Sequence, residues 1–79
     1  MSNITLFDTR LGDITLTAAL LARIRAGTFD LSLWDEKNGS VKFDSVVANA
    51  VVAGSKTVRA LHPAHGHRVI TAAVLNGLT

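Results

Sequence analysis

The sequence predicts an α+β fold in which one helix packs on a small antiparallel sheet of about four strands. Three observations support this prediction. Residues 15–26 have the apolar spacing of an amphipathic helix, residues 30–44 alternate around an Asn-Gly pair, and the valine-rich runs further on favour strands. At 79 residues, the chain is expected to form a single small domain, 1–79.

The first third of the chain is predicted to be a short strand, a turn and the helix. Residues 3–7 alternate weakly, with Ile4 and Leu6 on one side, and residues 8–13 have the composition of a turn. The helix is predicted over 15–26, capped by Asp13 or Thr15 and ended by Gly27.

The helix has two apolar faces. One face carries the larger side chains, Leu16, Leu20, Leu21 and Ile24, and the other is lined by Ala18, Ala19 and Ala22. A helix with alanine behind and leucine in front can pack on two sides. We therefore take Ala18 and Ala22, together with Trp34, as one candidate partner-binding surface.

The middle of the chain carries the clearest local signal, a β-hairpin over 30–44. Two alternating runs flank Asn38-Gly39, and both of those residues tolerate positive φ. The buried face is predicted to carry Leu31, Leu33, Val41 and Phe43. Trp34 is then expected to point away from the core with the polar side chains, where a partner can reach it.

The last part of the chain is ambiguous between strands and helices. Residues 45–53 fit helical spacing between Asp44 and Gly54, but their four valines favour a strand, which we prefer. Residues 56–61 and 68–75 flank a turn-like segment and suggest a second hairpin, while a helix over 68–76 is the alternative. No internal repeat, linker or low-complexity segment is apparent.

The composition favours a partner. Apolar residues make up 48% of the chain and the mean hydropathy is +0.33, which is high for a domain of this size. Small domains are often stabilised by oligomerisation, so we expect self-association, most simply as a two-fold dimer. The absence of cysteine and of a signal peptide favours a cytoplasmic protein, and no uncharged stretch approaches the ~20 apolar residues of a membrane span.

The charges are divided unevenly along the chain. The net formal charge is +2, but residues 45–79 carry Lys56, Arg59 and Arg68 and no acidic residue. These three cations are predicted to form a basic surface for an acidic protein partner. A nucleic acid is the alternative partner, although three charges and few aromatic residues are little for such a role.

The three histidines, His62, His65 and His67, lie within six residues and are the candidate ligands of a metal ion. A solvated polar loop explains the same pattern, and no acidic residue is close in sequence to complete a site. Gly54-Ser55-Lys56-Thr57 departs from the phosphate-loop pattern, and the carboxylates have turn or capping roles available. The sequence therefore predicts no enzyme and no cofactor.

The function that fits these observations best is a non-catalytic protein–protein binding module, such as a small inhibitor, adaptor or assembly subunit that also self-associates. A nucleic-acid-binding regulator that uses the basic C-terminal half is one alternative. A small metal-binding protein that uses the histidine loop is the other.

Overall fold

The computed structural model describes residues 3–35, 37 and 39–79, and it contains three copies of one unit, a β-hairpin followed by a short helix. The first unit is β1 (Ile4–Asp8), β2 (Gly12–Leu16) and α1 (Ala18–Arg25). The second is β3 (Leu31–Asp35), β4 (Gly39–Phe43) and α2 (Ser45–Val52). The third is β5 (Val58–His62), β6 (Gly66–Ile70) and α3 (Ala72–Asn76).

The units repeat every 27 residues. Ile4, Leu31 and Val58 begin the three hairpins in the same antiparallel register, opposite Leu16, Phe43 and Ile70. The same interval separates the helix N-caps, Thr17, Asp44 and Thr71, whose side chains accept hydrogen bonds from Leu20, Val47 and Val74. Our expectation of no internal repeat was therefore wrong.

Each hairpin turns through three residues and then a glycine with positive φ, at Gly12, Gly39 and Gly66. Gly39 has φ +76°, a left-handed conformation that follows a three-residue turn and that other residues adopt at a cost. The predicted hairpin over 30–44 is thus present, with Leu31, Leu33 and Phe43 buried, while Asn38 lies outside the described residues.

The predicted fold class was wrong, because there is no four-stranded sheet. The structure has three separate two-stranded sheets and three helices among its described residues. The preferred strand over 45–53 is a helix, because Asp44 caps it and only Ala48 and Val51 need to be buried. Residues 68–75 leave the strand after Ile70 and become α3, and the predicted first helix begins only at Ala18, after strand β2.

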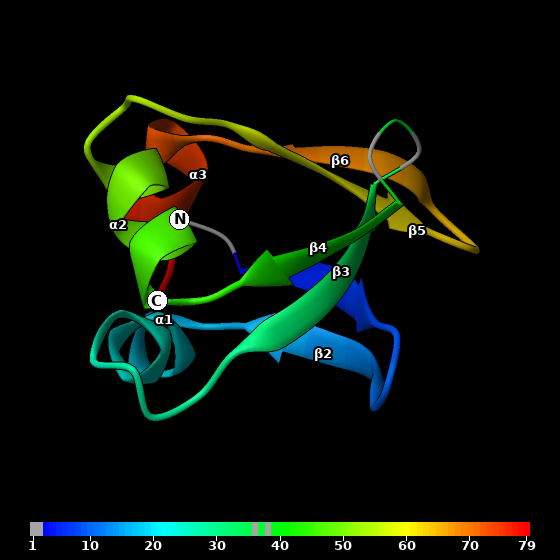
Figure 1. Cartoon of the computed structure of the whole chain (residues 1–79), viewed down its shortest axis with the longest axis horizontal. Helices are drawn as coiled ribbons and strands as arrows, with labels where there is room; N and C mark the ends of the chain where they lie inside the picture. The colour runs from blue at the N-terminus through cyan, green and yellow to red at the C-terminus, as the bar shows by residue number, and fades with distance from the viewer. Residues whose placement is uncertain (1–2, 36, 38) are drawn as a thin grey trace.

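The core lies between the hairpins and the helices. In Figure 1 the helices gather on one side, the hairpins extend from them, and both ends of the chain lie on the helix side. Strands β1, β3 and β5 contact one another, and the fully buried Leu16, Phe43 and Ile70 occupy equivalent positions beneath the helices. The accessible surface is 4407 Å², close to the ~4600 Å² expected for a monomer of this mass. The apolar residues are thus largely absorbed by the core.

Candidate functional site

An apolar pocket of about 270 Å³ lies where the three hairpins meet, away from the helices. It is lined by Phe7, Thr9, Trp34, Leu61 and Pro63, and we call it the apolar pocket. Phe7, Trp34 and Leu61 hold the same position in the three units, next to last in β1, β3 and β5. They alternate with buried residues, so their side chains point to the outer face of each hairpin.

The mouth of the pocket is open. The Trp34 side chain is 45% exposed, and Phe7 and Leu61 are half-buried. The sequence predicted an outward Trp34 but not its neighbours, because the meeting of β1, β3 and β5 depends on contacts between distant segments. The 27-residue interval was the available signal, since it places Phe7 and Leu61 on either side of Trp34.

Hydrogen bonds at the ends of the hairpins hold the lining strands together. The buried Asp8 carboxylate accepts the backbone N–H groups of Arg10 at 2.7 Å and Leu11 at 3.0 Å, which shapes its own turn. Its second oxygen accepts the N–H of Ser32 at 3.0 Å, and the N–H of Thr9 donates to the Ser32 carbonyl at 2.8 Å. The first hairpin is thus tied to the start of the second.

These bonds also set the ionisation of Asp8. Burial raises the pKa of this carboxyl, but the hydrogen bonds from Ser32, Arg10 and Leu11 together outweigh burial and leave the pKa below its ordinary value. The Asp8 side chain is therefore a carboxylate at neutral pH, and its charge holds three backbone donors in place.

His62 takes the position of Asp8 in the third unit and does a similar job. Its Nδ1 accepts the N–H of Ala64 at 3.0 Å, so the proton of the neutral ring is on Nε2, which lies 2.9 Å from Oδ1 of Asp13. The ring is 5% exposed. The structure therefore supplies the acidic neighbour that the sequence placed nowhere near, and it uses His62 to join the third hairpin to the first.

The three histidines do not converge. The rings of His62 and His65 are 4.4 Å apart, but both nitrogens of His62 are already in hydrogen bonds. His67 is on the outer face of β6, opposite Leu61. Within the part of the chain that the structure describes, no cluster of three histidine, cysteine or acidic side chains is arranged to hold a metal ion.

The predicted basic surface is divided between two faces. Arg59 is exposed on the outer face of β5, and Lys56 is exposed before that strand begins, nearer the helices. Arg68 pairs with the buried Ala60 and so lies on the inner face, where its Nε is buried without a partner among the described residues. Only Arg59 of these three lies beside the apolar pocket.

Arg59 helps to line a second pocket of about 280 Å³, together with Asp35, Lys37 and His67. We call it the cationic pocket. The alternative surface is also divided, because Ala18 and Ala22 are exposed on α1, on the helix side, whereas Trp34 is near the hairpin ends.

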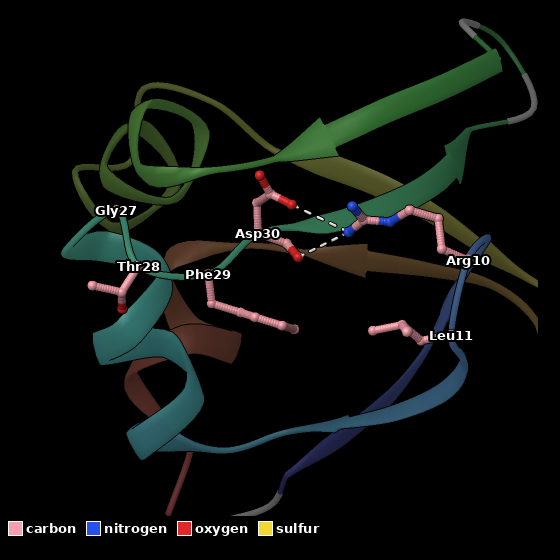
Figure 2. A pocket seen from close by; sticks show the side chains of 6 residues that line it. All are labelled: Arg10, Leu11, Gly27, Thr28, Phe29 and Asp30. Atoms are coloured by element: carbon pink, nitrogen blue, oxygen red, sulfur yellow. Dashed lines mark hydrogen bonds and ion pairs between the residues drawn. The ribbon is translucent and has the colours of Figure 1, made fainter.

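A wider cleft of about 350 Å³ opens between the first hairpin turn and the segment after α1, lined by Arg10, Leu11, Gly27, Thr28, Phe29 and Asp30. Figure 2 shows Leu11 and Phe29 pointing toward one another across it. The Arg10 guanidinium donates to the carbonyl and to the carboxylate of Asp30, both at 3.1 Å. Hydrogen bonds to Asp8 and to Asp30 raise the pKa of Arg10, so the polar groups of this cleft bind one another.

The chain matches no family model, no curated protein and no solved structure. Among the described residues, none of the helices has the length and apolar character needed to cross a membrane.

Proposed function

We propose that this protein is a non-catalytic protein–protein binding module whose recognition surface is the apolar pocket. One observation carries the proposal: the same outward position in all three hairpins is apolar, and the three side chains meet around a pocket that no other described segment covers. An aromatic side chain with a rigid, half-open surface is typical of the centre of a protein interface. A cytoplasmic location belongs to the same proposal, because the chain has no cysteine.

The chemistry of the pocket favours binding over catalysis. Its five described lining residues offer two aromatic rings, a leucine, a proline and one hydroxyl, and none of these side chains titrates near neutral pH. The nearest titratable groups, Asp8 and His62, use their side-chain atoms to hold the hairpin ends. Rigid walls lower the entropy cost of receiving a partner side chain.

The test is a selection of peptides from a random displayed library on the folded protein, compared with Trp34→Ala. Val46→Ala is the matched control, because Val46 is 75% exposed on α2 and its truncation removes apolar surface elsewhere. We expect the wild type and the Val46 variant to enrich the same peptides and the Trp34 variant to lose them. Selection that is indifferent to Trp34 would remove the basis of the proposal.

A further inference from the structure

The apolar pocket and the cationic pocket are neighbours. Trp34 and Asp35 are consecutive in β3, and Leu61 pairs directly with His67 across the third hairpin. Arg59 and Leu61 are two residues apart on the outer face of β5, which is roughly 6.6 Å along a strand. A ligand in the apolar pocket therefore lies within reach of the Arg59 guanidinium.

The charge beside the apolar pocket is not balanced by the described residues. The described carboxylates are engaged within the protein: Asp8 and Asp35 accept backbone N–H groups of their turns, Asp44 caps α2, Asp13 bonds His62, and Asp30 pairs with Arg10 and Lys42. The exposed side chains of Arg59 and Lys37, by contrast, form no ion pair with another described residue.

We propose, building on the proposed function, that the partner is an extended acidic protein segment with an apolar side chain two residues from a carboxylate. In an extended segment, residues i and i+2 point to the same side about 6.6 Å apart, which matches the spacing of Leu61 and Arg59. The apolar side chain enters the apolar pocket, and the carboxylate meets the guanidinium of Arg59 and the ammonium of Lys37. Arginine binds carboxylates through two parallel hydrogen bonds, which fixes the direction of the segment.

Trp34 provides the readout, because it is the single tryptophan of the chain. Its fluorescence is followed while four tryptophan-free peptides are added in separate titrations at low salt. The first contains Leu-Ser-Glu, the second Leu-Ser-Gln, and the third Ser-Ser-Glu. The fourth has the glutamate moved six residues from the leucine. We expect the first peptide to bind about tenfold tighter than each of the others.

Two variants of equal charge change locate the effect. Arg59→Gln should abolish the advantage of the glutamate peptide over the glutamine peptide, whereas Lys56→Gln, an exposed cation outside both pockets, should preserve it. The advantage should shrink as salt is added, because the pair is exposed to solvent. Loss of the advantage in both variants equally would overturn the assignment to Arg59.

Further outcomes decide between this inference and the proposed function. Equal binding of the glutamate and glutamine peptides, with a Trp34 response, overturns the acidic partner and leaves the proposed function standing. No response to any peptide, together with no Trp34-dependent selection from the library, overturns both. A Trp34 signal that changes with protein concentration alone assigns the pocket to a second copy, and tighter binding to duplex DNA than to the first peptide assigns it to a nucleic acid. Either result rejects the acidic segment.

Discussion

Replacing Asp8 by asparagine tests how the hairpin ends are held together. The amide oxygen of Asp8→Asn can still accept the N–H groups of Arg10 and Leu11, but its NH₂ group then faces the N–H of Ser32, which loses its acceptor. An unsatisfied buried donor costs about 1–3 kcal/mol, and the loss of the carboxylate weakens the two remaining bonds. We expect the free energy of unfolding to fall by about 2–4 kcal/mol.

The measurement is urea unfolding, followed by Trp34 fluorescence and by circular dichroism. Asp13→Asn is the matched control, because Asp13 is 63% exposed and an amide oxygen can still accept the Nε2–H of His62. This control should stay within about 0.5 kcal/mol of the wild type. If the two variants are equally stable, Asp8 does not join the first two hairpins as described.

The same variant has a pH signature whose sign follows from the lowered pKa of Asp8. The folded protein holds this pKa below that of the unfolded chain, about 3.9. The stabilisation is therefore complete above the unfolded pKa and is lost as pH falls through the folded pKa. The difference in stability between the wild type and Asp8→Asn should be constant near neutral pH and should narrow below about pH 4. A difference that persists unchanged under acid would contradict this reasoning.

Three further predictions concern the turns, the inner face of the third hairpin and the oligomeric state. Gly39→Val should cost at least about 1–2 kcal/mol of stability in thermal unfolding, because φ is +76° there, whereas Gly39→Asn should be milder; equal effects would mean that backbone conformation is not the cause. Arg68→Met should leave stability unchanged or raise it by up to about 1 kcal/mol, because it removes a buried unpaired Nε. The outward Arg59→Met is its control, and a clear loss on Arg68→Met in urea unfolding would show that the guanidinium is satisfied. Self-association, if present, should use the helix side, where Val46 is 75% exposed; sedimentation equilibrium should then show a mass above 8.4 kDa that Val46→Glu lowers, and a constant 8.4 kDa would reject the dimer.

The sequence predicted local features well where one residue type dictates the backbone. The Asn-Gly hairpin and the outward Trp34 followed from turn chemistry and strict alternation, and both are present in the described residues. Valine propensity misled us over 45–53, because burial of one helix face and the Asp44 cap outweigh a small intrinsic preference.

The repeat was missed because its units share shape rather than identity. Leu6, Leu33 and Ala60 hold one core position, and that core accepts any apolar side chain that fits. Asp8 and His62 differ chemically, yet each accepts an N–H group two residues further on. The glycines at the turns and the helix N-caps keep the interval of 27 residues, since they alone satisfy backbone requirements that few residues meet.

The proximity of the chain ends has a consequence for the unfolded state. The N–H of Thr79 donates to the Asn3 side chain at 2.8 Å, and the Thr79 carbonyl accepts the N–H of Ala18 at 3.2 Å. A short peptide linker joining the two ends would strain the folded protein little but would remove conformational freedom from the denatured ensemble. For a ring of 79 residues, the chain-entropy treatment used for disulfides gives about 4.5 kcal/mol at 25 °C. A cyclised backbone would thus gain its stability almost entirely from the state that has no structure.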